Sequence, residues 1–507
     1  MKRISSILIS LLLVAALLTM AGCGKAEEKH DPNLDVLEYT FYAEDAADLA
    51  KLDVYSNLQT LDLRGSNCYA AIESYIASHP QVKVTYDVEV AGTRYAPDVE
   101  SLTLEDGSFE VKELVTVLKH LPKLTALELP KTTLTIGQVN SICEANPNLA
   151  VSYTVELLGQ EVGPEMSEID LSGLMPAEVE ETLMLKLQLL TGLTNIQLMK
   201  ADGTSNYAPA DVKLMMDQLP DVAMNYSFDL FGKTITTADE RVEFKDWDIY
   251  NEGVPQIRAA LDILPNCTYF LLDNCGIDNE IMAQLRDDYP NTKVVWRVFW
   301  GSKHHVLTDT EMIVANKVKS ESVYVLKYCT EVKYLDLGHS EGLKNIEFVR
   351  YMPNLVILIL SDCRITDLSP VENCKNLEMI EIVKAYTITD VSPLANCPKL
   401  KGINMSGVKK IKDITSLYGL KDMKRLYIGG TGVSEEMYEE ACEAMPDCWI
   451  SNKLYHSSGV WMNYAVGWRL DKGGTWSQWY LDMREIFRYD EYYYSGKEKR
   501  THQKVSQ

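Results

Sequence analysis

The sequence predicts an α/β solenoid, in which short parallel strands stack into a curved sheet and helical segments return the chain between them. Residues 329–450 align with a period of 22 or 23 residues, and residues 35–328 align with a longer period of about 70. The chain has 507 residues, of which 46% are hydrophobic, so it can bury a large core. In a repeat array this length measures the number of stacked units and gives no domain count.

The first 22 residues have the features of a secretion signal. A basic start precedes an apolar run over residues 7–18, which is too short to span a bilayer core of ~30 Å comfortably. Small residues then precede Cys23, and this segment resembles the lipobox of bacterial lipoproteins. The resemblance implies that Cys23 is diacylated, which would anchor the protein on the extracytoplasmic side of the bacterial cell membrane. The alternative is ordinary cleavage near residue 22 with a free cysteine.

Residues 23–34 contain almost no apolar side chains and are expected to form a lipidated tether. The whole chain carries a formal charge of −24. Removal of the signal leaves 47 basic and 73 acidic residues, a charge of −26. This acidity argues against nucleic acid or an anionic membrane surface as the main partner, but it identifies no ligand.

Residues 35–328 are expected to form divergent units of about 70 residues. Each unit carries an aromatic strand and then a glycine turn, at Gly92, Gly159, Gly232 and Gly301. In the second unit, periodicity predicts a helix, a strand, a second helix and a second strand over residues 111–121, 127–129, 139–143 and 151–158. The turn at Gly159 is expected to have hairpin character. The alternation of strands and helices resembles the architecture of ribonuclease-inhibitor-like repeats.

Residues 329–450 carry the clearest repeat. Five rows share the pattern L-x-x-L-x-L, and they begin at Val332, Leu355, Leu377, Leu400 and Met423. Segments with Asp and Ser or Thr two residues apart recur between rows, at residues 365–371, 388–394 and 411–417. These rows resemble the short leucine-rich repeat of the internalin type. The resemblance implies one strand per row with a short helical return, although the asparagine that the family places after the strand is missing here.

One position of the short repeat recurs just before each strand. It is occupied in successive rows by Cys329, Met352, Cys374, Cys397 and Leu420. A free cysteine packs as a small hydrophobic residue, so this alternation predicts a buried slot rather than a disulfide framework. Two pairs remain as alternatives, Cys442 with Cys448 and Cys267 with Cys275.

No catalytic residue, metal site or cofactor is predicted. His304 and His305 are adjacent, so on a strand they would point to opposite faces and could not easily share a metal; a turn is expected there. The sequence lacks the zinc-protease, phosphate-loop, nucleophile-elbow and dinucleotide motifs, and it lacks C-x-x-C. We therefore expect a protein that is not an enzyme, and an extracellular hydrolase is the least supported hypothesis.

Residues 451–495 depart from the repeat and are expected to form an aromatic capping segment, because the last rung of a solenoid exposes apolar edges. This segment contains Trp461, Trp468, Trp476 and Trp479. An alternative is that these rings stack on sugars, which would make the protein a carbohydrate-binding lipoprotein. The polar residues 496–507 are expected to form a flexible tail.

Alternation along the strands of residues 329–450 predicts a partner-binding surface. The apolar positions face inward, and the intervening positions face the exposed side of the sheet, which solenoids commonly offer to partners. The predicted partner-binding residues are Tyr334, Asp336, Ile357, Ile359, Met379, Glu381, Asn404, Arg425 and Tyr427. The alternative is that another part of the chain covers this face. We expect a surface-recognition or adhesion protein whose partner is an unknown protein.

Overall fold

The computed structural model describes residues 35–453, apart from residues 106, 180 and 301–303. The chain divides into two compact units. Unit 1 comprises the chain up to Gln197 together with Asp217–Ala223, and unit 2 comprises Leu198–Met216 together with everything from Met224 onward. Both units consist of short strands that alternate with helices or 3-10 turns, the predicted α/β arrangement.

Unit 1 is a series of short strands, with helices between the parallel ones. The strands are β1 (Glu38–Thr40), β2 (Thr60–Asp62), β3 (Lys83–Thr85), β4 (Val88–Val90), β5 (Thr93–Tyr95), β6 (Ser101–Thr103), β7 (Ala126–Leu129), β8 (Ala150–Tyr153), β9 (Val155–Leu157), β10 (Gln160–Val162), β11 (Glu168–Asp170) and β12 (Asn195–Gln197). The helices and 3-10 turns are α2 (Ala46–Ala50), η2 (Lys51–Val54), α3 (Tyr69–Ser78), α4 (Val111–Val117), η3 (Leu118–His120), α5 (Ile136–Ala145), η4 (Pro176–Glu178) and α6 (Glu181–Leu189).

Strands β1, β2 and β3 pair in parallel, and β6, β7 and β8 repeat this arrangement. The inward positions of the central strands are buried, as Leu61 and Leu127 show, and the helices pack apolar side chains such as Ile72 and Ile142 against them. The outward positions of the same strands are polar. A single buried face therefore holds each small sheet to its helices.

The predicted helices of this region and the hairpin turn at Gly159 are confirmed, but the second strand of that hairpin is β10 and not the predicted strand at residues 169–171, which pairs in parallel with β12. The helices α4 and α5 occupy the predicted places, and two-residue turns join β4 to β5 and β9 to β10. In the second turn both Leu158 and Gly159 have positive φ angles, of 50° and 77°, which suits the twist of a hairpin. The predicted strand over residues 151–158 is instead two strands. They meet at Thr154, because β8 pairs in parallel with β7 whereas β9 pairs antiparallel with β10.

Unit 2 continues the alternation and ends in the short repeats. Its strands are β13 (Ala223–Asn225, at the boundary), β14 (Ser227–Leu230), β15 (Lys233–Thr236), β16 (Arg241–Lys245), β17 (Tyr269–Asp273), β18 (Lys293–Trp300), β19 (His304–Leu307), β20 (Met312–Val314), β21 (Tyr334–Asp336), β22 (Ile357–Ile359), β23 (Met379–Glu381), β24 (Gly402–Asn404), β25 (Arg425–Tyr427) and β26 (Trp449–Ser451). The helices are α7 (Pro209–Gln218, at the boundary), α8 (Val254–Leu261), α9 (Asn279–Asp288), α10 (Ser320–Val323) and α11 (Glu435–Ala444). The 3-10 turns are η5 (Asn251–Gly253), η6 (Tyr324–Tyr328), η7 (Glu347–Tyr351), η8 (Ser369–Asn373), η9 (Ser392–Asn396) and η10 (Thr415–Leu417).

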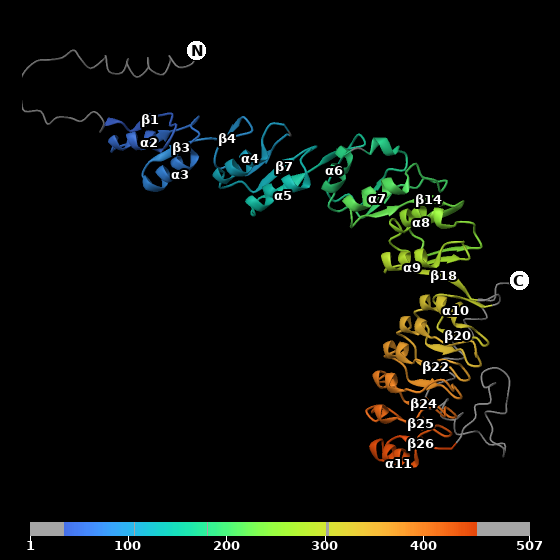
Figure 1. Cartoon of the computed structure of the whole chain (residues 1–507). Coiled ribbons are helices and arrows are strands. Elements are labelled where there is room, and N and C mark those ends of the chain that lie inside the picture. Colours follow the sequence, from blue (N-terminus) through green and yellow to red (C-terminus); the bar gives the residue numbers. More distant parts are fainter. Residues whose placement is uncertain (1–34, 106, 180, 301–303, 454–507) are drawn as a thin grey trace, which may run out of the picture. The chain divides into compact units, whose positions relative to one another are not determined.

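Strands β20 to β26 form one seven-stranded parallel sheet in sequence order. Figure 1 shows these strands stacked one after another, with the helical returns along one side of the stack. The five predicted rows are β21 to β25, and β20 and β26 extend the sheet by one strand at each end. The inward residues Leu335, Leu358 and Ile380 are fully buried, so they form one continuous core beneath the sheet.

The predicted cysteine slot is confirmed. Cys329, Cys374 and Cys397 are fully buried, and burial raises the pKa of Cys374 to about 12 and that of Cys397 to about 11. All ten cysteines between residues 35 and 453 are free thiols. The two alternative pairs, Cys442–Cys448 and Cys267–Cys275, are therefore not formed in this structure.

The predicted turn at His304 and His305 is wrong. Both residues begin β19, which pairs antiparallel with the end of β18. Two aromatic contacts hold this added strand, because the ring of His304 stacks on Trp300 at 5.7 Å and that of His305 lies 5.7 Å from Phe299. The local alternation of residues could not indicate this, since it is the length of β18 that lets the chain fold back onto it.

Candidate functional site

The register of the sheet places the predicted partner-binding residues in the predicted columns. Tyr334, Ile357, Met379 and Arg425 occupy equivalent positions in β21, β22, β23 and β25. Asp336, Ile359, Glu381, Asn404 and Tyr427 form the second column, two residues further along each strand. The structure therefore brings all nine residues together on one face of the sheet, which we call the C-terminal sheet face.

The expectation that this face is exposed is wrong. Tyr334, Ile357, Ile359, Met379 and Glu381 are each 0% exposed, and Asp336, Asn404 and Tyr427 are also buried. Arg425 is the one member of the set that is half-buried. The physical reason is that β21 to β24 are buried on both faces, so alternation separates two buried sides rather than a buried and a wet one.

Two carboxyl groups are buried within the C-terminal sheet face. Oδ1 of Asp336 accepts a hydrogen bond of 2.9 Å from the backbone N–H of Gly338, and burial raises the pKa of this carboxyl to about 7. Glu381 accepts a hydrogen bond from the hydroxyl of Ser361 through Oε1. Burying a carboxyl group is costly unless it is hydrogen-bonded or neutralised. Both carboxyl groups therefore belong to a covered, hydrogen-bonded surface, and they do not form an open catalytic pair.

In the small sheets of unit 1, by contrast, the outward strand residues are not covered. In β6 the outward residues Ser101 and Thr103 are exposed while Leu102 between them is buried, and β11 follows the same pattern with exposed Glu168 and Asp170. The hydroxyl of Thr103 donates to Glu128 on the neighbouring strand at 3.2 Å. The outward strand positions of unit 1 are thus exposed or half-buried, and most of them are polar, with five carboxylates among them. We call them the N-terminal strand face; they are Glu38, Thr40, Thr60, Asp62, Lys83, Thr85, Ser101, Thr103, Ala126, Glu128, Ala150, Ser152, Glu168, Asp170, Asn195 and Gln197.

A buried ion pair lies on the sheet of β16 to β19. The guanidinium of Arg297 makes a bidentate contact with Asp273, with N–O distances of 2.5 and 2.7 Å. A third nitrogen of Arg297 lies 2.8 Å from Nδ1 of His305, and burial together with this cation lowers the pKa of His305. Each group in this cluster is therefore engaged, and its geometry is that of a structural pair.

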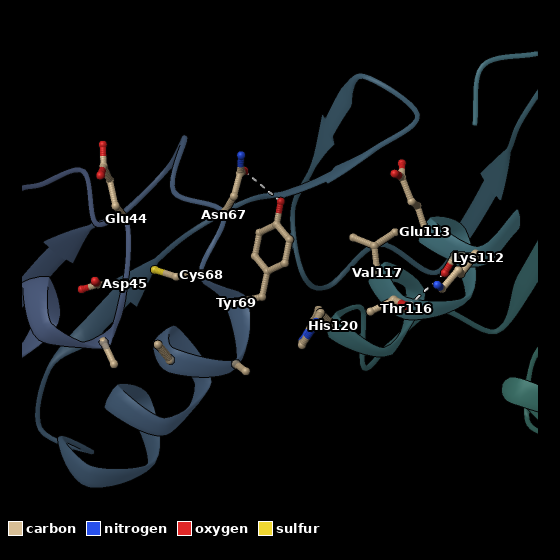
Figure 2. Close-up of a pocket in the computed structure, with 13 residues that line it drawn as sticks. Glu44, Asp45, Asn67, Cys68, Tyr69, Lys112, Glu113, Thr116, Val117 and His120 are labelled. Atoms are coloured by element: carbon tan, nitrogen blue, oxygen red, sulfur yellow. Dashed lines mark hydrogen bonds between the residues drawn. The ribbon is translucent and has the colours of Figure 1, made fainter. Parts of the chain in front are cut away.

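Unit 1 also contains an open groove of about 760 Å³ beside α2, α3 and α4. Figure 2 shows Glu44 and Asn67 at one side, Lys112 at the other and the ring of Tyr69 between them. The hydroxyl of Tyr69 donates to Oδ1 of Asn67 at 3.0 Å and accepts from the backbone N–H of Glu89 at 2.9 Å. The groove thus presents fixed polar groups of both charges.

The groove does not have the constellation of a nucleophilic enzyme. The thiol of Cys68 donates to the carbonyl of Ala43 at 3.4 Å, and burial raises its pKa, so a thiolate is disfavoured. His120 is engaged elsewhere, since its Nδ1 lies 2.8 Å from Glu73. In the described part of the chain, no three His, Cys, Asp or Glu side chains are grouped to hold a metal ion. The groove can therefore bind through hydrogen bonds and ionic contacts, without covalent chemistry.

Several predicted residues lie outside the described residues. Cys23, the signal and the tether precede residue 35, and the tryptophans at 461, 468, 476 and 479 follow residue 453. Among the described residues of 35–453, no helix is long and apolar enough to cross a bilayer.

Comparison with known proteins agrees with this geometry. Residues 353–396, which include β22 and β23, match the family described as "Leucine Rich repeats (2 copies)". These residues carry leucine-rich repeats within the α/β stack of parallel strands and helical returns described above. No curated protein matches it.

Three solved structures are similar to this solenoid at low identity. Internalin C2 of Listeria monocytogenes is 20% identical, over 43% of this chain and 85% of that one, with a TM-score of 0.26. An internalin, InlF, of the same organism is 12% identical over 84% of both chains, with a TM-score of 0.24. A leucine-rich-repeat protein of Leptospira interrogans is 16% identical, over 83% of this chain and 96% of that one, with a TM-score of 0.24.

The solenoid contains one signal that could have indicated the burial of the C-terminal sheet face. Residues 355–360 are apolar without interruption, and residues 379–383 are apolar apart from Glu381. Near-continuous apolar runs are typical of parallel strands that are covered on both sides. No repeat consensus marks the acidic outward positions of unit 1, so the sequence alone does not distinguish them from other acidic residues.

Proposed function

We propose that the protein is a non-catalytic recognition scaffold of the bacterial cell surface, anchored through a lipid on Cys23, whose N-terminal strand face binds a partner protein. One observation carries this proposal: the outward strand positions of unit 1 are accessible and acidic, while those of the short repeats are buried. Glu38, Glu128, Glu168 and Asp170 are exposed at these outward positions, against a single lysine, Lys83. Asp62 also lies here, but it is half-buried and ion-paired with Arg64. The partner's surface is therefore expected to be basic.

Several sheet features support recognition rather than chemistry. Side chains on successive strands project from a rigid backbone, so a stack of strands presents a large, fixed pattern of contacts. Strand register holds Thr103 opposite Glu128 and Asp170 opposite Gln197. A pattern of hydroxyl, amide and carboxylate groups in fixed places suits a polar protein surface.

The recognition proposal can be tested by photo-crosslinking on intact cells. A photo-reactive amino acid at Thr103 or Ser152 is expected to trap a discrete partner, which mass spectrometry identifies. The same probe at Glu144 on α5 or Glu181 on α6 serves as the control, because both residues are exposed on helices. Equal adducts from helix and strand positions, or none from the strands, would contradict the proposal.

Charge reversal on the same face distinguishes specific recognition from general acidity. Glu168→Lys with Asp170→Lys should weaken binding of the trapped partner at least tenfold, and the loss should diminish as salt is raised. Glu144→Lys with Glu181→Lys makes the same change in net charge on the helices. If this control weakens binding equally, the strand face is not the site.

The anchoring proposal has its own test. Labelled palmitate is expected to enter the full chain and to be absent from a Cys23→Ala variant, which should leave the membrane fraction. Incorporation of label into the variant would refute lipidation at Cys23. This outcome is independent of the crosslinking result.

A further inference from the structure

The C-terminal sheet face is buried in a way that the strands and returns alone do not explain. A strand in a solenoid packs one side against its helical returns, and its other side meets whatever lies across the sheet. In unit 1 the second side is exposed, as Ser101 and Thr103 of β6 show. In β21 to β24 every residue of each strand is buried. Something therefore lies across the sheet of the short repeats.

The described elements of unit 2 supply only the first layer. The 3-10 turns η7, η8 and η9 follow their strands and stack along one side of the sheet (Figure 1). Their buried residues, such as Val349, Val371 and Leu394, belong to the inward core. Tyr334 and Met379 project from the opposite side and are still fully buried.

The face has the chemistry of a docking surface for an aromatic segment that also carries hydrogen-bonding groups. Ile357, Ile359 and Met379 form an apolar centre, with Tyr334 on the adjacent strand. Carboxyl groups are buried beside this centre at Asp336 and Glu381. At the end of β24 and just after it, the amide Nδ2 of Asn404 and the hydroxyl of Ser406 are buried with no hydrogen-bond partner in the described part of the chain.

The chain itself provides a segment of this chemistry. Residues 454–507 follow directly after β26, the last strand of the same sheet. They hold four of the eight tryptophans of the chain. Residues 454–495 hold four Lys and Arg against five Asp and Glu, so this part of the chain is close to neutral while the whole chain carries −24.

The segment is long enough to cross the whole sheet. Seven strands spaced ~4.8 Å apart span roughly 30 Å. An extended chain covers about 3.3 Å per residue, so about ten residues would cross the sheet once. The 42 residues from 454 to 495 could therefore cover the face with several passes.

We propose that residues 454–495 dock across the C-terminal sheet face as an intramolecular cover, with aromatic side chains against Tyr334, Ile357, Ile359 and Met379. The face predicted to bind a foreign partner is then occupied by the chain's own segment. An external partner could reach it only by displacing this segment. This inference is independent of the recognition surface proposed for unit 1.

The cover can be tested in the full chain with a protease site inserted between Lys453 and Leu454. After cleavage, the fragment 454–507 is expected to co-elute with the body in gel filtration. A matched variant with all four tryptophans of residues 461–479 changed to serine should release the fragment after the same cleavage. Release of the fragment from the nicked parent protein would overturn the proposal.

Oxidative footprinting of the uncleaved chain provides the second readout. Met379 should be protected in the parent protein and should become oxidised several-fold faster in the four-tryptophan variant. Leu358, which faces the inward core, is the internal control for intact folding and should remain protected in both. If Met379 stays protected in the variant, or if its protection depends on protein concentration, another occupant or a second copy covers the face and the proposal fails.

Discussion

At the scale of single residues, the buried carboxyl group of Asp336 makes the stability of the protein depend on pH. Asp336 is buried and receives a backbone N–H from Gly338, and burial raises its pKa from 3.8 to about 7. The folded protein therefore keeps this proton up to about pH 7, while the unfolded chain releases it near pH 4. The stabilising contribution is complete below the unfolded pKa and is lost as the pH rises through 7.

Asp336→Asn should remove this dependence on pH. The amide oxygen can still accept from Gly338, and the side chain carries no charge. We expect the variant to match the parent near pH 4 and to exceed its free energy of unfolding at pH 8 by about 2–4 kcal/mol. Urea denaturation from pH 4 to 8.5 measures this difference, and a constant offset over that range would contradict the burial of the ionised group.

A glycine in the last turn shows how closely adjacent rungs approach. A Cβ on Gly432 would lie 2.6 Å from the carbonyl oxygen of Lys409, whereas a Cβ on Gly419 would meet nothing within 4 Å. The backbone N–H of Gly432 also donates to the carbonyl of Ile411 at 2.8 Å. Because the main chains pack closely there, position 432 requires glycine, whereas position 419 does not.

Gly432→Ala is expected to lower the free energy of unfolding by about 1–3 kcal/mol, because the backbone must move to admit the methyl group. Gly419→Ala provides the control and should be neutral or slightly stabilising. Thermal unfolding of both variants decides the point. Equal stability of the two variants would show that the backbone around residue 432 can move to admit a methyl group without loss of stability.

At the scale of elements, the short repeats share one capping device before their 3-10 turns. The backbone N–H and the hydroxyl of Ser369 both donate to the carboxylate of Asp367 at 2.8 Å, and Asp390 with Ser392 and Asp413 with Thr415 repeat the arrangement. These hydrogen bonds hold the pKa of Asp367 below its ordinary value, chiefly through the backbone N–H. The motif noted in the sequence is thus the start of each return.

Asp367→Ala should cost about 1 kcal/mol of stability at neutral pH, as for other lost caps. Because the folded pKa is lowered, the contribution is present above the unfolded pKa and is lost as the pH falls through the folded value. The deficit of the variant should therefore shrink below pH 4. Asp367→Asn, which keeps an acceptor, should lose less, and a deficit that does not change with pH would argue against the carboxylate as the cap.

At the scale of the whole molecule, stability is shared between neighbouring rungs. Parallel pairing links β20 to β26 in strict sequence order, so each rung meets only the rungs on either side. In such an array, stability is approximately the sum of the rungs and their interfaces. The seven-stranded sheet should therefore respond to damage as a chain of coupled neighbours.

Ile380→Ala, in the central strand β23, is expected to cost about 2–5 kcal/mol through the cavity it leaves. Hydrogen exchange should accelerate most in β22, β23 and β24, and less in β20 and β26. Amides of unit 1, which forms its own compact body, should not change. Uniform acceleration through both units would instead indicate a single cooperative block.

Repeat chemistry explains how much of this architecture the sequence could predict. Leucines spaced as L-x-x-L-x-L determine inward positions, and their period determines register, so the columns that contain Tyr334 and Asp336 were predictable. Alternation does not say what lies across a sheet, and the burial of Ile359 is indicated only by the uninterrupted apolar run of residues 355–360. The strand Trp449–Ser451 could not be predicted because it lacks the leucine pattern, although it pairs with β25 in the same parallel register.

The candidate site was less predictable than the fold. Sequence reasoning sought a partner surface where apolar outward residues gather, yet in this molecule those residues are covered. The accessible face instead carries Glu128, Glu168 and Asp170, which resemble ordinary surface acids in a chain with 73 acidic residues. Only their place on the outward side of paired strands separates them from exposed helical acids such as Glu144.

The free thiols of the short repeats make individual rungs chemically addressable. Cys329, Cys374 and Cys397 precede β21, β23 and β24, and each is sealed beneath its own return. An alkylating reagent can modify such a thiol only when that return opens. The order in which the three cysteines are alkylated would show which return opens first. Local unfolding of the repeats could thus be followed with native residues and no engineered probe.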